Sequence, residues 1–202
     1  GIDEVSLARY GAYPWDRDIY ANLLASLETY GPRVVGFDIL FAESRKGDDA
    51  FINALRASKT DIVFGSKLEG EMYIPPVYMG LSSRVHAGVV NVFPDNDAKV
   101  RSVQNYFLYN KECLPSFSKK ILTVATKTSE YVPGKCDTNQ HLFRYQENID
   151  TVSFVDVVDK SVPKEMLQDK IILIGFATTD LEQDSFFGLF GRKINGVEIH
   201  AS

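Results

Sequence analysis

Three short apolar segments constrain the fold of this chain more than any other feature of its sequence. They lie near Val34–Asp38, Ile62–Gly65 and Lys170–Ile174. Apolar residues occupy both faces of each segment, as in a strand that is covered on both sides. Covered strands of this kind are typical of α/β folds, so we expect the three to be adjacent and parallel in one sheet.

Amphipathic helices separate these strands. The segment from Asp16 to Tyr30 carries its apolar side chains at helical spacing, with Asp16 as the expected N-cap and Gly31-Pro32 as a stop. Further helices are expected at Asp48, after Pro115 and after Ser153. The alternation predicts a three-layer α/β sandwich with a mixed, mainly parallel central sheet.

An antiparallel hairpin insertion is expected at Gly88–Tyr109. The segments Gly88–Phe93 and Val100–Tyr109 are rich in Val, Tyr and Phe, and Pro94–Asp97 between them has the composition of a turn. The segment from Thr178 to Asn195 is expected to be a long polar-aromatic loop. No repeat, low-complexity tract or domain boundary is visible, so residues 1–202 are treated as a single domain.

Composition argues against two classes of protein. The 202 residues are 45% hydrophobic and 24% charged, which is ordinary for a globular protein, and the net charge is -5. Lys and Arg are scattered, which disfavours a nucleic-acid surface. No apolar run reaches the roughly 18 residues that a membrane-spanning helix needs. The chain starts at Gly1 without a signal peptide, and we expect it to be an excised domain.

The sequence lacks the common catalytic and cofactor-binding motifs. It contains no Gly-x-Ser-x-Gly elbow, no Gly-x-x-x-x-Gly-Lys phosphate loop and no Gly-x-Gly-x-x-Gly fingerprint. His86, His141 and His200 form no metal-binding pair, and Asp95-Asn96-Asp97 lacks the glycine and glutamate of a calcium loop. Structural histidines and a hairpin turn are favoured over metal sites. We therefore expect no catalytic residue, no cofactor and no metal.

Asp38 is the most informative polar residue, because it is a carboxylate inside an otherwise apolar strand. A buried carboxylate requires a partner, and the candidates are Arg17, Arg101 and His200. If the strand ends near Asp38, its side chain lies at the carboxyl edge of the sheet, where α/β proteins bind ligands. Asp184 follows the last strand and could reach the same edge. Two interpretations stay open: a structural ion pair, and a ligand pocket formed by Asp38, Arg101, Asp184 and His200.

Three further features have two interpretations each. Cys113 and Cys136 flank one expected helix, and they are either free thiols or, if the domain lies outside the cytoplasm, a disulfide. Trp15 is either a packing anchor for the first long helix or a ligand-stacking ring. The aromatic run at Phe186–Phe190 either packs on the core or contacts a partner or a membrane surface.

Several motifs, in their order along the chain, resemble the second subtype of the CHASE domains, which are extracellular sensory modules associated with cyclases and histidine kinases. The resemblance covers most of the chain, from Pro14 to Ala201. The last matching motif, Gly196–Ala201, has the pattern of a helix start. The matching motifs are Pro14-Trp15-Asp16-Arg17-Asp18, Gly36-Phe37-Asp38-Ile39-Leu40-Phe41, Asp48-Asp49, Val90-Asn91-Val92, Pro94–Asp97 with Val100-Arg101, Leu114-Pro115-Ser116, Thr151–Phe154, Lys170–Ala177 and Gly196–Ala201.

The resemblance implies a sensor rather than an enzyme. Domains of this subtype follow a membrane span, lie outside the cytoplasm and lead back into membrane helices. Those helices connect to cyclase, diguanylate cyclase, histidine-kinase or serine/threonine-kinase output domains. The implied partners are these helices, an output domain and an unknown small-molecule or protein signal; a homodimer stays open, and nucleic acid is not expected. The family supplies no ligand-binding residues.

A small α/β hydrolase is the alternative function. It would use Asp38, Asp184 and His200. Such an enzyme needs a nucleophile activated by a neighbouring base, and Ser44 is the only hydroxyl that closely follows the first strand. No neighbouring base marks Ser44 as activated, so the sensor is favoured.

Overall fold

The computed structural model describes residues 1–128, 136–142, 144–146, 149–177, 185–187 and 193–202. Its central sheet has five strands in the order β3-β2-β1-β9, with β4 also pairing with β2. The strands are β1 (Val34–Leu40), β2 (Asp61–Glu69), β3 (Met72–Ile74), β4 (Val85–Val89) and β9 (Ile171–Ile174).

The three apolar segments are adjacent and parallel, as the sequence predicts. Val34 of β1 lies opposite Asp61 of β2 on one side and Ile171 of β9 on the other. β4 continues the sheet beyond β2 in the same direction, while β3 pairs antiparallel with the end of β2. The sheet is therefore mixed and mainly parallel, and the predicted fold class is confirmed.

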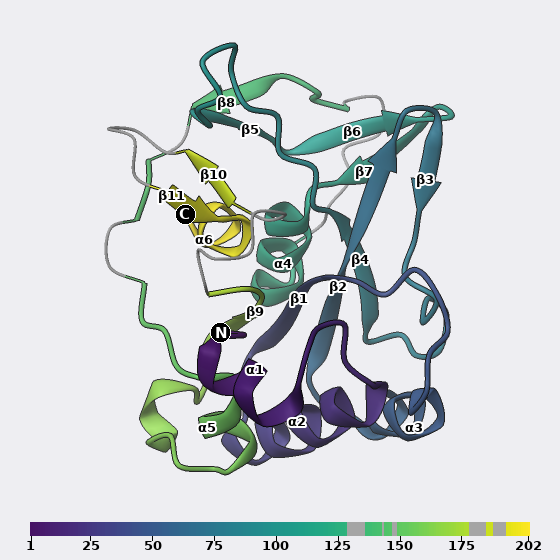
Figure 1. The fold of residues 1–202 in the computed structure, drawn as a ribbon. Helices are drawn as coiled ribbons and strands as arrows, with labels where there is room; N and C mark the ends of the chain where they lie inside the picture. The colour runs from purple at the N-terminus through teal and green to yellow at the C-terminus, as the bar shows by residue number, and fades with distance from the viewer. Residues whose placement is uncertain (129–135, 143, 147–148, 178–184, 188–192) are drawn as a thin grey trace.

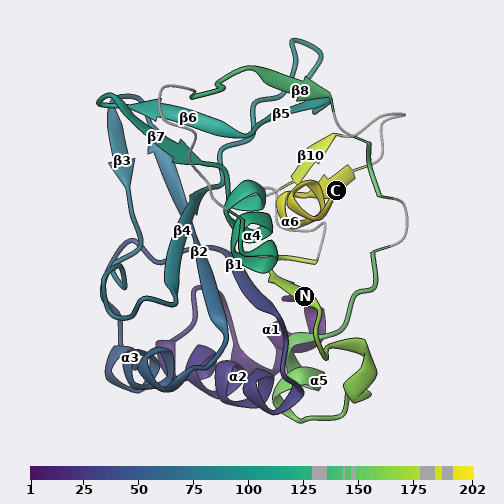
Figure 2. The ribbon, with the colours of Figure 1, turned by 180° about the vertical axis from the view of Figure 1, so that it is seen from behind.

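Helices cover both faces of the sheet, and the layers can be followed in Figures 1 and 2. On one face, a large core joins α2 and α3 to residues Val35, Phe37 and Ile39 of β1. On the other face, Phe117 and Ile121 of α4 pack on Val34. The helices are α1 (Glu4–Tyr10), α2 (Arg17–Tyr30), α3 (Asp48–Ala57), α4 (Phe117–Thr126), α5 (Phe154–Val158) and α6 (Gly196–Ala201).

The sequence signals for the helix ends act largely as expected. Gly31 ends α2 in the left-handed conformation, with φ of 70°, and its N–H bonds to the Leu27 carbonyl. Ser116 and Ser153 cap α4 and α5 with their side chains. Asp16 stands at the N-cap of α2 but makes no side-chain cap bond, because its carboxylate pairs with Lys46 at 2.8 Å.

Trp15 anchors the start of α2. Its side chain is buried, and the indole N–H donates to the Gly11 carbonyl at 2.9 Å. The ring meets Tyr10 and Phe154 edge-to-face, with ring centroids 5.2 Å apart in both cases. These contacts tie α1, α2 and α5 into one layer, which matches the packing interpretation of Trp15.

The predicted hairpin at Gly88–Tyr109 is wrong in its pairing. The turn exists, because the Asp95 N–H bonds to the Lys99 carbonyl at 2.8 Å. However, β4 before it pairs parallel with β2, and β5 (Ser102–Gln104) after it pairs with β8 (Gln140–Leu142).

The real hairpin joins β6 (Tyr106–Tyr109) to β7 (Glu112–Pro115). Its two-residue turn, Asn110-Lys111, has positive φ at both positions, 47° and 70°, as the tight turns of hairpins require. The signal was missed because lysine seldom marks such a turn.

The predicted loop at Thr178–Asn195 also needs correction. Its described parts form two short antiparallel strands, β10 (Ser185–Phe187) and β11 (Lys193–Asn195). β11 leads directly into α6 at the C-terminal end of the chain, as Figure 1 shows. These strands place α6 against the sheet.

Candidate functional site

A bulge in β1 places Asp38 at the carboxyl edge of the sheet. The pairing of β1 with β2 shifts between Phe37 and Leu40, and its pairing with β9 ends at Phe37 opposite Ile174. Asp38 therefore follows the last residue of β1 that pairs with β9 and lies within the irregularity of its pairing with β2. Bulges often redirect a side chain beside a functional site, and ligands of α/β sheets bind at this edge.

The Asp38 side chain faces the α4 side of the sheet and is buried. Only 8% of the side chain is exposed, and its Oδ2 has no hydrogen-bond partner among the described residues. Burial raises the pKa of the Asp38 carboxyl to about 7, because a charged carboxylate is poorly solvated there. The site therefore holds an acid that titrates near neutral pH.

His200 of α6 is the described residue that faces Asp38. Its Nε2 lies 3.9 Å from Oδ1 of Asp38, and 6% of its side chain is exposed. This distance is longer than a hydrogen bond but within ion-pair range. The imidazole packs edge-to-face on Phe117, with ring centroids 5.3 Å apart. The pair thus joins the sheet edge to the last helix.

Ser118 fixes His200 from the first turn of α4. Its Oγ donates to the His200 carbonyl at 3.0 Å and lies 3.3 Å from Nδ1 of the same residue. The start of α6 is held as well, because the Glu198 carboxylate accepts from the Asn195 N–H at 2.9 Å. Sequence reasoning missed Ser118, since nothing in the local pattern connects it to a histidine 82 positions away.

Arg101 is engaged by the turn that precedes it. Its guanidinium donates to Asp95 at 2.6 Å and to Asp97 at 2.8 and 2.7 Å. These bonds hold the pKa of Asp97 well below its usual range. The Asp95-Asn96-Asp97 motif therefore binds an arginine within its own loop, as a turn does.

Arg17 is also paired away from Asp38. Its Nε lies 3.6 Å from Asp48, a guanidinium N–H donates to the Glu43 carbonyl at 3.2 Å, and the group stacks on the Phe41 ring at 4.4 Å. Of the predicted site residues, Asp38 and His200 are thus brought together. Asp184 lies outside the described residues.

The described histidines and acids form no cluster of three or more groups that could hold a metal ion. His86 lies 3.4 Å from Asp61, and His141 lies 3.1 Å from Asp137. The His141–Asp137 pair is exposed, unlike the pair at the sheet edge. It can therefore serve as an exposed control pair in experiments on Asp38 and His200.

A cavity of about 880 Å³ runs along β9 beside His200. It is bounded by Ile171 and Leu173 of β9, by Ser118 of α4, and by Val197 and His200 of α6. Its lining mixes apolar side chains with polar and charged ones, which include Asp150, Thr151 and Lys170 as well as Glu198 of α6. His200 is the residue that both faces Asp38 and lines this cavity.

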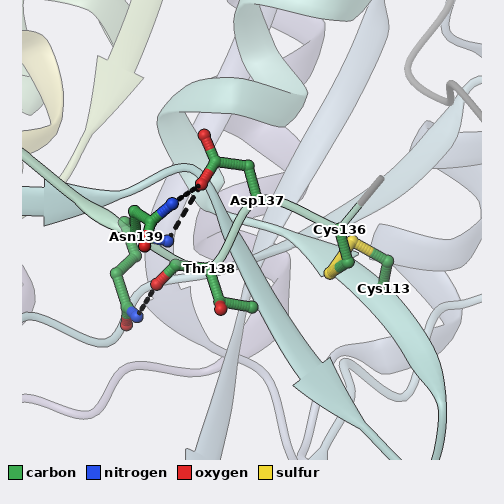
Figure 3. Close-up of a disulfide and its surroundings, with 6 residues drawn as sticks. Cys113, Cys136, Asp137, Thr138 and Asn139 are labelled. Carbon is green, nitrogen blue, oxygen red and sulfur yellow. Dashed lines mark hydrogen bonds between the residues drawn. A yellow bond between two sulfur atoms is a disulfide. The ribbon is translucent and has the colours of Figure 1, made fainter. Parts of the chain in front are cut away.

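Cys113 and Cys136 are joined in a disulfide, shown in Figure 3. The Sγ atoms are 2.16 Å apart and the Cα atoms 5.6 Å apart. The bond ties β7 to the segment that leads into β8. After it, the Asp137 carboxylate accepts from the side-chain amide of Asn139 at 2.7 Å. Disulfides persist in oxidising compartments and are rare in the cytosol.

The family model of the CHASE2 domain matches residues 1–202. No match was found among curated proteins or solved structures. Among the described residues, no helix combines the length and the hydropathy needed to cross a membrane. A match over the whole length shows the family directly: the chain belongs to the CHASE2 domains, sensory domains of signal-transduction receptors that are generally extracellular.

Proposed function

We propose that this chain is the extracytoplasmic signal-input domain of a membrane-bound bacterial receptor. The single observation that carries the proposal is the CHASE2 match over residues 1–202. In the proposed receptor, membrane helices connect the domain to a cytoplasmic cyclase, diguanylate cyclase or kinase. A small-molecule or protein signal is sensed outside, a homodimer is one arrangement to test, and the domain itself catalyses no reaction.

The Asp38–His200 pair supports a route for the signal through the molecule. Asp38 lies two residues before the end of β1, and His200 lies in α6. A stimulus that changes the pair would move α6 relative to the sheet. Such a stimulus must bind one arrangement of α6 better than the other, since only differential affinity can shift the balance between the two.

The location can be tested by thiol labelling in intact cells that express the receptor. After mild reduction, a membrane-impermeant maleimide should label Cys113 and Cys136, and without reduction it should not. A Cys113→Ser, Cys136→Ser variant controls for other thiols. Labelling that appears only after cell lysis would contradict the extracytoplasmic location.

A hydrolase is the second candidate function, and Ser118 is the observation that favours it. Ser118, His200 and Asp38 lie in the order of a nucleophile, a base and an acid, with 3.3 Å and 3.9 Å between successive groups. Against it, the Ser118 hydroxyl is directed at the His200 carbonyl. A fluorophosphonate probe that labels wild type but not Ser118→Ala would establish this activity, and we expect no labelling.

A further inference from the structure

The contacts of Ser118 determine which ring nitrogen of a neutral His200 carries a proton. The Ser118 Oγ lies 3.0 Å from the His200 carbonyl oxygen and 3.3 Å from Nδ1. A carbonyl oxygen can only accept, so the single hydroxyl proton is donated to it. Oγ then accepts from Nδ1, which makes Nδ1 the protonated nitrogen.

The other nitrogen, Nε2, therefore presents a lone pair toward Asp38. An ionised carboxylate is also only an acceptor, so two acceptors would face each other at 3.9 Å. The side chains are 6% and 8% exposed, which leaves little room for solvent to separate them. A proton between the two groups removes this conflict, and the raised pKa of Asp38, about 7, is consistent with one being retained up to neutral pH.

We propose that Asp38 and His200 form a proton-binding site: the pair retains one proton, on Oδ1 or on Nε2 across the 3.9 Å that separates them, and releases it to solvent as the pH rises. Release changes the charge of the pair from zero to minus one and leaves a buried carboxylate beside an imidazole lone pair. Moving α6 outward relieves this arrangement by admitting water. The inference rests on the proposed function only in treating the proton as a stimulus.

Among the described residues, no Lys or Arg forms an ion pair with Asp38. Burial is the sole resolved cause of its pKa shift, so no described charge offsets the loss of hydration. Lys170 and Lys193 line the cavity beside His200. Four further charged side chains on neighbouring elements contact other residues. Glu198 contacts the Asn195 N–H, Lys119 the Tyr106 ring, Lys67 the Glu69 carboxylate, and Arg45 the Glu43 carboxylate.

The shared proton can be tested by NMR titration of the 202-residue chain. The Asp38 carboxyl carbon and the His200 ring nitrogens should change together, with one midpoint near pH 7. The exposed pair is the matched control: hydrogen bonds from Asn139 lower the pKa of Asp137, so the Asp137 carboxyl should titrate below its usual range and not near pH 7. An Asp38 that titrates alone, at the acidic pH of an ordinary aspartate, would overturn the proposal.

The effect on α6 can be tested by hydrogen exchange of Asp38→Asn against wild type at equal pH. The asparagine amide can donate to Nε2 as the protonated carboxyl would, so this variant should keep α6 packed. Near pH 8.5 the amides of α6 should exchange about tenfold more slowly in this variant than in wild type. A tenfold change in the opening equilibrium of α6 has the same free energy as a shift of one pKa unit. At pH 5.5 the two proteins should be equal.

Equal exchange of the two proteins at both pH values would contradict the coupling to α6. If Asp38→Asn does not fold, His200→Gln provides the second test, because glutamine has no basic ring nitrogen that could take up the proton. Its Asp38 midpoint should move away from the wild-type value, and an unchanged midpoint would refute a shared proton. None of these measurements depends on a membrane, so the thiol labelling can fail or succeed independently of them.

Discussion

Asp38 is a buried carboxylate between two apolar residues of β1, Phe37 and Ile39. The sequence is sufficient to identify it, because a charge inside an apolar strand is unusual and needs a partner. His200 is one of its three predicted partners, and it is the one that the structure places nearby at 3.9 Å. Ser118 could not be predicted, since only the packing of α4 against α6 brings it to His200.

We expect Asp38→Asn to stabilise the chain relative to wild type as the pH rises. The folded state raises the pKa of Asp38 from 3.8 to about 7, so it binds a proton that the unfolded chain releases, and wild type loses stability across this interval. Three pKa units correspond to about 4 kcal/mol, so the variant should gain roughly that much between pH 4 and pH 7.5. Urea unfolding at several pH values measures this gain, and a pH-independent difference would contradict it.

The contact of α4 with β4 sets the position of Ser118. A Cβ atom at Gly88 would lie 2.6 Å from the Phe117 Cα and 2.9 Å from the Ser116 carbonyl oxygen. These are backbone atoms, which cannot turn aside as a side chain can. Glycine therefore allows the start of α4 to approach the sheet closely, and Ser118 follows one residue later.

Gly88→Ala should cost about 1–3 kcal/mol in unfolding free energy, as overpacking of a core typically does. Gly36→Ala is the matched control, because its new Cβ would meet only side-chain ends, the nearest being Ile121 Cδ1 at 2.6 Å. Those ends can shift, so we expect a smaller loss. Chemical denaturation of both variants compares them, and an equal or larger loss for Gly36→Ala would show that the α4 backbone is not the obstacle.

Three strands of the central sheet were predictable, whereas the pairing of β4 and the small sheets were not. Covered apolar runs identify β1, β2 and β9, because a strand buried on both faces leaves a continuous apolar pattern. Strands β5 and β8 have only three residues each and lie far apart in the sequence. Their pairing depends on tertiary contacts, for which no local signal exists.

Removal of the disulfide should destabilise the segment that carries β7. The bond joins residues 23 positions apart, and the chain-entropy model gives about 3 kcal/mol for a loop of this length. Cys113→Ser with Cys136→Ser should lower the free energy of unfolding by that order, and reduction of wild type should reproduce the effect. A loss of unfolding free energy no larger than the experimental error would show that the disulfide does not reduce the conformational entropy of the unfolded chain.

In the molecule as a whole, α6 is packed against the carboxyl edge of the central sheet. The predicted α/β sandwich positions the carboxyl ends of parallel strands, and α6 packs against that edge through His200 and Ser118. A sensor needs such a connection, because a local change must alter the geometry of an element that continues the signal. The proposed route runs from Asp38 to α6 and from there toward the output domain.

The output of the proposed membrane-bound receptor, recorded as the external pH is stepped from about 8 to about 6, measures this connection in the cell. Wild type and the exposed-pair variant His141→Gln should both respond to the step. Asp38→Asn should lose the response and keep at both pH values the output that wild type shows at about pH 6, because its side chain neither gains nor loses a proton and α6 stays packed. A folded Asp38→Asn receptor, expressed at the wild-type level, that responds to the step as fully as wild type would contradict the proposed route through Asp38 and His200.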